Sequence, residues 1–401
     1  MIPRFKPFIG KEELLSLFQF RKSAVQAFET EFAAMFSSQF ALAFPYGRSA
    51  LWAFFKAMGI VGAEIVQPAY TCSVVGHATV LSNNIPVFVD IDLDNYNMDL
   101  GQLQKAITPK TRAVIPTHLF GCPIDIDAVA QIVREAEKRF GQRIYTIQDC
   151  AHSFEAEWQG KSVVNAGDGA LFGLNISKQL TSIFGGMFST NDAEIAAKLE
   201  TWREANYSEK SLIEKLRRAA YLPAAVFGFN DFIYGITYWL QTNTSLLTQL
   251  TDAYHLDEKI HFPPDYLKNL SAVEANVGMA QLKKYTVIKS RRRAIAEEYF
   301  SRLKVPPAWI MPPQIEGSTY SHFVMRVPDR DQIMAHSARK GVQLGQLIEY
   351  SMPHHPAYQQ YAKNNQFPNS LLCSRSLINL PIHPGLSRKN IEKVIDAVSH
   401  I

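Results

Sequence analysis

The stretch FALAFPYGRSALWAFFKAMGIVGAEIVQPAYTCSVVGHATVLSNNIPVFVDID (40–92) decides the fold, because short apolar runs alternate in it with longer amphipathic segments. The apolar runs have the length of strands, and the segments between them repeat apolar residues at helical spacing. The predicted strands are residues 40–44, 64–68 and 86–92, and the predicted helices are residues 49–59 and 73–82. This alternation indicates an α/β protein with a mainly parallel sheet that helices cover on both faces.

The same alternation continues toward residue 149. Residues 111–119 and 143–149 are predicted strands, and residues 124–140 form a predicted amphipathic helix between them. Ligands of such sheets bind outside the carboxyl ends of the strands. The residues that end each apolar run are therefore candidates for a functional site.

The pattern changes near residue 285. The elements expected beyond it are helices over 286–303, 330–340 and 387–399 and an antiparallel strand over 320–327. We therefore expect two domains, a large one over residues 1–285 and a smaller C-terminal α+β domain over residues 286–401.

The composition is typical of a soluble globular protein, with 47% hydrophobic and 19% charged residues in a chain of 401. A net charge of +4 gives no reason to expect nucleic acid as a partner. The four cysteines form no CxxC pair, which argues against a metal site and against a disulfide framework. The opening MIPRFKPFIG lacks the apolar core of a signal peptide, so we expect a cytoplasmic enzyme.

The longest apolar segment covers residues 219–250. Pro223, Asn230 and Asp231 interrupt it, and no run of about 18 apolar residues is present, so we expect no transmembrane span. Two interpretations stay open: a helical insertion that is buried or faces another subunit, which we favour, and an element that lies on a membrane surface.

Asp149 ends the predicted strand over residues 143–149. A carboxylate buried at this place requires a partner. It could pair with a pyridinium nitrogen and keep that ring protonated, which makes the ring an electron sink. The alternative is that Asp149 caps the turn that follows.

Lys178 follows an apolar run and precedes the glycine pair Gly185-Gly186. Burial disfavours the charged form of a lysine, so its pKa falls and the free amine becomes a usable nucleophile. The alternative is an ordinary surface lysine in a loop.

The turn Tyr46-Gly47-Arg48-Ser49 joins a predicted strand to a predicted helix. Free N–H groups at the start of a helix bind anions, and Arg48 adds positive charge. Glycine and serine also occur at such junctions simply to form the turn and to cap the helix. An anion site and a purely structural turn both stay open.

Several segments, taken together and in order, resemble the DegT/DnrJ/EryC1/StrS aminotransferases, a sugar-aminotransferase branch of the fold-type-I pyridoxal phosphate enzymes. They are IPRFKPFIGKEE (2–13), IVQPAYTCSVVGHATVLSNNIPVFVDIDLDNYNMD (65–99), AVIPTHLFGCPIDIDAV (113–129), QDCAHSFEAEWQGKSVVNAGDGALF (148–172), SAVEANVGMAQLKKY (271–285) and INLPIHPGLS (378–387). The resemblance implies a three-layer αβα large domain, pyridoxal 5′-phosphate as the cofactor, and a homodimer.

The resemblance also implies roles for single residues. Lys178 matches the catalytic lysine that holds the cofactor as a Schiff base, and Asp149 matches the partner of the pyridinium nitrogen. His152 takes the place of the family's Gln or His near the phenolic oxygen of the ring. Arg48 and Ser49 fall where the family binds the phosphate.

Three positions depart from the family pattern. Cys72 stands where the family places an aromatic ring against the cofactor, so either a sulfur contact would replace stacking or Tyr70 would take part. Gly173 stands where the family often has a phosphate-binding serine, and Ser177 could supply the missing hydroxyl. Lys268 and Asn269 are the candidates that would reach the phosphate from the neighbouring subunit, and Asn269 is the one we favour.

The function implied is transfer of an amino group from an amino acid, glutamate by analogy, to a keto-sugar that is linked to a nucleotide. Amination of a non-sugar cyclic ketone and a regulatory protein without turnover are the alternatives. A sister group of sugar dehydratases replaces the lysine with histidine, so Lys178 argues against that activity. The segment EYSMPHHPAY (349–358) matches one that lines the family's substrate cavity.

Overall fold

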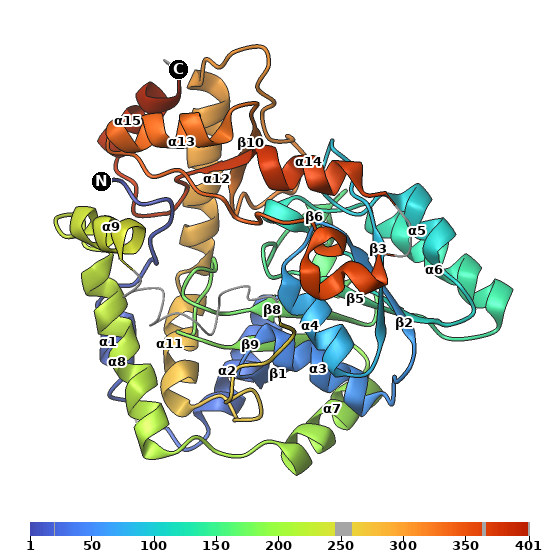
Figure 1. The fold of residues 1–401 in the computed structure, drawn as a ribbon. Coiled ribbons are helices and arrows are strands. Elements are labelled where there is room, and N and C mark those ends of the chain that lie inside the picture. The colour runs from blue at the N-terminus through green and yellow to red at the C-terminus, as the bar shows by residue number, and fades with distance from the viewer. Residues whose placement is uncertain (20, 245–258, 363–365, 400–401) are drawn as a thin grey trace.

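The computed structural model describes residues 1–19, 21–244, 259–362 and 366–399. Its centre is a seven-stranded sheet with the strand order β1-β9-β8-β5-β4-β2-β3 (Figure 1). The strands are β1 (Phe40–Phe44), β2 (Glu64–Pro68), β3 (Ile85–Val89), β4 (Thr111–Val114), β5 (Tyr145–Asp149), β8 (Gly169–Gly173) and β9 (Gly186–Thr190). Only β9 runs antiparallel to its neighbours, so the predicted mainly parallel sheet is confirmed.

Helices cover both faces of this sheet and make three layers. One hydrophobic cluster lies under α2 (Ala24–Met35), α5 (Leu100–Ala106), α6 (Ile126–Phe140) and α11 (Ala272–Leu282). A second cluster lies under α3 (Gly47–Ala57), α4 (Ser73–Leu81) and α7 (Ala193–Asn206) on the opposite face. The short elements α1 (Lys11–Ser16), β6 (Glu157–Trp158) and β7 (Lys161–Ser162) lie outside the sheet.

Helix α6 shows how the sequence sets these elements. Its buried residues Ile126, Val129 and Val133 recur at helical spacing on one face. The Asp125 carboxylate accepts a hydrogen bond from the Ala128 N–H (2.9 Å) and caps the start of the helix. Gly141, at a φ of 67°, ends it in the left-handed conformation that glycine adopts without steric cost.

The C-terminal part forms a smaller unit with its own core. It contains α12 (Tyr285–Arg302), β10 (Phe323–Arg326), α13 (Arg330–Arg339), α14 (Pro368–Ser376), β11 (Leu377–Leu380) and α15 (Arg388–Ser399). Strands β10 and β11 pair antiparallel, and Ile2 from the chain start packs into the same hydrophobic cluster. The first helix of this unit thus begins beside the expected domain boundary, and that boundary remains a prediction.

The apolar insertion begins earlier than the sequence suggested. Its described part consists of α8 (Leu212–Gly228) and α9 (Tyr234–Asn243), and residues 245–250 lie outside the described residues. The expected helices are confirmed, but within them only Leu222 and Tyr234 are buried. The exposed apolar side chains are Leu212, Ile213, Leu216, Phe227, Phe232, Ile236 and Trp239.

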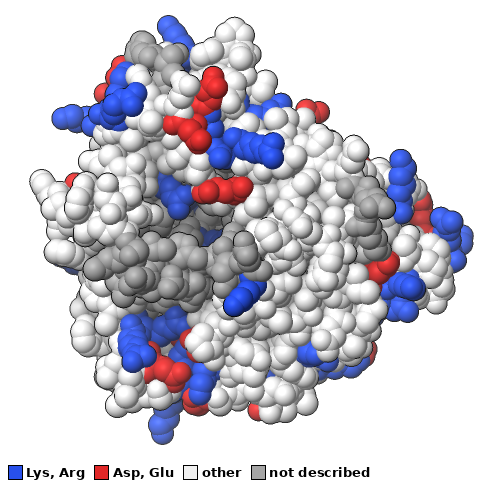
Figure 2. All heavy atoms as spheres, in the orientation of Figure 1, with Lys and Arg blue, Asp and Glu red and all other residues white. Residues whose placement is uncertain are grey.

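The surface over α9 carries few charges, whereas lysine and arginine side chains gather elsewhere along the margin of the same face (Figure 2). Among the described residues, no helix combines the length and hydropathy that a membrane crossing would require. The described part of the insertion therefore consists of two surface helices with exposed apolar side chains.

Candidate active site

Asp149 and Lys178 come together at the carboxyl end of the sheet. Asp149 is the last residue of β5, and Lys178 lies in the loop that joins β8 to β9. Strands β5 and β8 are adjacent and parallel. The Lys178 stem lies beside β8, because a Cβ on Gly173 would be 3.3 Å from the Lys178 Cε. The two candidates therefore share one site.

Burial and charge together set the protonation of both groups. Burial raises the pKa of Asp149, while a hydrogen bond from the Ala151 N–H (3.0 Å) and the charge of Lys178 oppose that rise. Burial likewise lowers the pKa of Lys178, and Cys72 and Asp149 oppose that fall. The site thus places an amine whose charged form is disfavoured by burial near a carboxylate that favours a cationic partner.

His152 lies next to this pair, and a second histidine joins it from the smaller unit. The His152 Nδ1 accepts a hydrogen bond from the Phe120 N–H (3.4 Å), and the two rings stack with centroids 6.4 Å apart. The centroid of the His322 ring lies 4.8 Å from that of His152. Burial lowers the pKa of both histidines, and the positive charge of Lys178 lowers it further, so both are neutral at pH 7.

The sequence did not identify His322, because it falls within a predicted strand. In the structure β10 starts at Phe323, so His322 lies directly before the first residue of the strand. A histidine directly before a buried apolar run was the one signal that could have drawn attention to it.

The start of α3 has the properties of an anion site. Gly47 fits tightly, since a Cβ there would lie 3.0 Å from the Phe172 carbonyl oxygen. Arg48 is buried and its guanidinium lies 5.7 Å from the centroid of the Tyr46 ring. The Ser49 Oγ is buried, and no group in the part of the chain that the structure describes bonds to it. A buried hydroxyl without a partner is costly unless a ligand satisfies it.

Cys72 is exposed at the N-cap of α4. It lies close enough to Lys178 to influence the pKa of that amine. The next residue, Ser73, donates its N–H to the Tyr350 hydroxyl (2.8 Å), which comes from the C-terminal part of the chain. Tyr350 is thus a further residue at this edge that the sequence did not single out.

The segment around Tyr350 is fastened to the large sheet. The Met352 N–H donates to the Ala69 carbonyl (2.8 Å), and the Tyr358 hydroxyl donates to the Ser73 carbonyl (3.2 Å). The His354 Nδ1 lies 3.0 Å from the Ser351 Oγ. The segment that resembles the family's cavity lining therefore forms a fixed wall beside α4.

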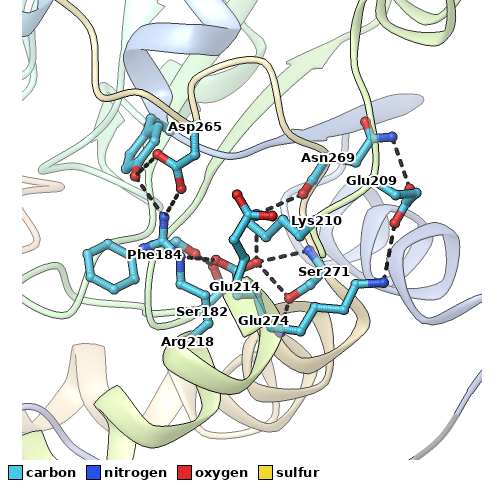
Figure 3. A network of polar contacts seen from close by, with 12 residues as sticks. Ser182, Phe184, Glu209, Lys210, Glu214, Arg218, Asp265, Asn269, Ser271 and Glu274 are labelled. Atoms are coloured by element: carbon cyan, nitrogen blue, oxygen red, sulfur yellow. Dashed lines mark hydrogen bonds and ion pairs between the residues drawn. The ribbon is translucent and has the colours of Figure 1, made fainter. Parts of the chain in front are cut away.

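Ser177 and Asn269 are engaged in other contacts. Ser177 is exposed and its hydroxyl donates to the Asn175 Oδ1 (2.7 Å). The Asn269 side-chain amide donates to the Glu209 Oε1 (3.0 Å), and the Asn269 backbone carbonyl accepts from the Lys210 Nζ (2.7 Å), as Figure 3 shows. Their assignment to the phosphate remains a prediction.

Comparison with known proteins identifies relatives over the whole chain. A model of the DegT/DnrJ/EryC1/StrS aminotransferase family matches residues 16–233 and 243–399. The spore coat polysaccharide biosynthesis protein SpsC of Bacillus subtilis is 26% identical over an alignment that covers 100% of this chain and 97% of SpsC.

Solved structures share the fold. The sugar aminotransferase CalS13 from Micromonospora echinospora superposes with a TM-score of 0.79 at 16% identity, covering 100% of this chain and 99% of CalS13. PseC from Helicobacter pylori, an aminotransferase involved in the biosynthesis of pseudoaminic acid, gives a TM-score of 0.77 at 17% identity, with coverage of 99% and 98%.

The residues fit pyridoxal 5′-phosphate, the cofactor used by aminotransferases of that family. The Lys178 amine, with its lowered pKa, suits the aldehyde, and the buried Asp149 carboxylate suits a protonated ring nitrogen. The unpartnered Ser49 hydroxyl at the start of α3 suits the phosphate. One group is therefore present for each reactive part of the cofactor.

Proposed function

This chain belongs to the DegT/DnrJ/EryC1/StrS aminotransferase family, and we propose that it transfers an amino group from glutamate to the ketone of a nucleotide-linked sugar. The observation that carries the proposal is the pairing of an activated amine, Lys178, with the buried carboxylate of Asp149. The cofactor is pyridoxal 5′-phosphate. Two relatives support the sugar acceptor, since SpsC is named for polysaccharide biosynthesis and CalS13 is named a sugar aminotransferase.

When bound, the cofactor supplies a ring that withdraws electrons from the carbon that loses its proton. Lys178 would hold the cofactor through its amine and, once released by the amino donor, would take a proton from the α-carbon of that donor. Asp149 would keep the ring nitrogen protonated. Burial raises the pKa of this carboxyl, so its ionised form is stable only when a cation, here the protonated nitrogen, lies beside it.

The remaining residues would position the cofactor. Arg48 and Ser49 would bind the phosphate at the start of α3, where free N–H groups add their partial charges. His152, held neutral by its surroundings, would contact the phenolic oxygen, and Cys72 would contact the ring face. Ser177 and Asn269 complete the proposed set, Asn269 from the neighbouring subunit.

We also propose a homodimer. Exposed apolar side chains on α8, on α9 and in the turn between them support an extended subunit contact, with Phe232 in the turn at 95% exposure and Ile236 on α9 at 62%. Light scattering should give twice the monomer mass for the wild type. A Phe232→Asp/Ile236→Asp variant should be more readily dissociated, and an unchanged dimer on dilution would show that α9 lies outside the contact.

A half-reaction screen tests the acceptor. The protein loaded with pyridoxamine 5′-phosphate is mixed with nucleotide-linked keto-sugars and, separately, with free cyclic ketones. The proposal predicts that a nucleotide-linked keto-sugar restores the absorbance of the aldehyde form of the cofactor. Recovery with a free cyclic ketone alone would reject the sugar acceptor while leaving aminotransfer in place.

A further inference from the structure

Arg218 connects the surface insertion to the inner structure of the large unit. Its side chain projects from α8, and its Nη2 donates to the Tyr46 hydroxyl (2.7 Å) and to the Asp265 Oδ2 (2.5 Å). Its guanidinium carbon lies 3.9 Å from the centroid of the Phe184 ring. Four segments that are distant in sequence therefore meet at this one side chain.

Glu274 closes the network on its other side (Figure 3). This fully buried carboxylate lies 3.5 Å from the Arg218 Nε and 3.0 Å from the Lys210 Nζ. It also accepts a hydrogen bond from the Ser271 hydroxyl (2.7 Å). With Asp265, the cluster contains two cations and two carboxylates, so it adds no net charge. We therefore expect this network to act by fixing the positions of the segments that it joins, and not by adding charge to the site.

The network contacts residues on both sides of the close packing between Gly47, at the start of α3, and Gly186, at the start of β9. Tyr46 is the N-cap of α3 and directly precedes Gly47. Gly186, the first residue of β9, packs so closely on this junction that a Cβ there would lie 2.2 Å from the Gly47 nitrogen. Phe184 stands two residues before Gly186. Arg218 thus holds Tyr46 on one side of the contact and Phe184 on the other.

We propose that Arg218 is a positioning residue that fixes the start of α3 against β9 and so keeps the phosphate-binding groups of Arg48 and Ser49 in place. This inference rests on the proposed function, because the phosphate is that of the cofactor. It makes the insertion part of the machinery that retains the cofactor, in addition to any role that its exposed apolar surface has.

The test compares two ligands that differ only in the phosphate. Pyridoxal 5′-phosphate and pyridoxal both offer an aldehyde to Lys178, but only the first carries the phosphate that the start of α3 would bind. The dissociation constants of both ligands are measured by absorbance for the wild type, Arg218→Gln and Arg217→Gln. Arg217 is an exposed arginine on the same helix, so Arg217→Gln is the matched control. Arg218→Gln should weaken pyridoxal 5′-phosphate about tenfold and change pyridoxal less than about twofold, because each lost hydrogen bond to a charged group has this order of effect. Arg217→Gln should change neither.

Two results would overturn the inference. Equal affinity of wild type and Arg218→Gln for pyridoxal 5′-phosphate would show that the network does not act on the site. An equal loss for both ligands, together with a lower melting temperature, would show a general structural role. If the wild type bound no pyridoxal 5′-phosphate at Lys178, the proposed function itself would fail and the inference with it.

Tyr46→Phe keeps the experiment decisive if Arg218→Gln does not fold. This variant removes only the hydroxyl that Arg218 and Asp265 share, and preserves the ring. It should weaken pyridoxal 5′-phosphate in preference to pyridoxal by a few-fold, the size expected for a single hydrogen bond. An unchanged ratio of the two dissociation constants would reject the inference on its own.

Discussion

His152 and His322 lie with their ring centroids 4.8 Å apart, although one follows a strand of the large sheet and the other precedes a strand of the C-terminal unit. Lys178 is near enough to both rings to lower the pKa of each. The site is therefore built where the two units of the chain meet, and its geometry depends on both.

Replacing His322 should affect turnover more than cofactor binding. His322→Phe keeps an aromatic ring beside His152 but removes the nitrogen atoms. We expect kcat/KM to fall about tenfold, which is less than the roughly 10²-fold or more that a general acid or base contributes. His322→Gln should recover part of the loss, because it can still form hydrogen bonds. Steady-state kinetics and a cofactor titration on both variants check this. Wild-type kcat/KM in His322→Phe would show that the ring nitrogens do not contribute.

The charge of Asp149 should matter more than its shape. Asp149→Asn preserves the volume and can still accept the Ala151 hydrogen bond, but it cannot stabilise a protonated ring nitrogen. We expect kcat to fall by about 10²-fold or more while the cofactor still attaches to Lys178. Asp168→Asn, at a part-exposed carboxylate paired with Arg143, is the matched control and should keep its activity. Equal rates in wild type and Asp149→Asn would refute the role of the carboxylate.

Acid should destabilise the protein through buried neutral histidines, of which His118 is the clearest. Its Nε2 lies 2.9 Å from the Gln148 Oε1, its Nδ1 accepts from the Ile124 N–H (3.2 Å), and burial lowers its pKa to about 4. The unfolded chain has the higher pKa, near 6.5, so it binds a proton that the folded protein excludes between pH 6.5 and 4. The free energy of unfolding therefore falls as the pH falls through this window.

The expected loss from His118 between pH 6.5 and 5 is about 1.6 kcal/mol, because the slope reaches its limit of about 1.4 kcal/mol per pH unit only below the pKa of the unfolded chain. Urea unfolding of the cofactor-free protein at both pH values measures it. In His118→Asn the free energy of unfolding should fall less between pH 6.5 and 5, and the difference from the wild type should equal the contribution of His118. We expect this variant to be less stable than the wild type at pH 7. The same pH dependence in both proteins would contradict the assignment.

The local sequence pattern predicts an element correctly where the element depends mainly on its own residues. Residues 40–44 and 64–68 were predicted as strands and match β1 and β2, since each is a short apolar run between turn residues. The strand predicted over 111–119 ends at Val114 instead. Pro116 has no N–H to donate and interrupts the ladder, and only an isolated bridge between Thr117 and Asp149 follows it among the described residues.

Contacts between residues far apart in the sequence cannot be predicted from the local pattern. The strand predicted over 86–92 ends at Val89, and the Asp90 N–H donates to the Gln102 Oε1 (3.2 Å) instead of to a neighbouring strand. The Asp90 carboxylate accepts hydrogen bonds from the N–H groups of Asn369 (2.9 Å) and Ser370 (2.8 Å). The same reason hid His322 and Arg218, whose importance comes from partners far along the chain. Asp149 and Lys178 were found because resemblance supplied the partnership that the sequence alone left open.

Chemical trapping at Lys178 tests the central claim most directly. The wild type and Lys178→Ala are incubated with pyridoxal 5′-phosphate, reduced with borohydride, digested and analysed by mass spectrometry. A single peptide containing Lys178 should carry the reduced cofactor in the wild type, and Lys178→Ala should show neither this adduct nor turnover. An adduct on other lysines only, or turnover by Lys178→Ala, would contradict the assignment of this residue as the one that holds the cofactor.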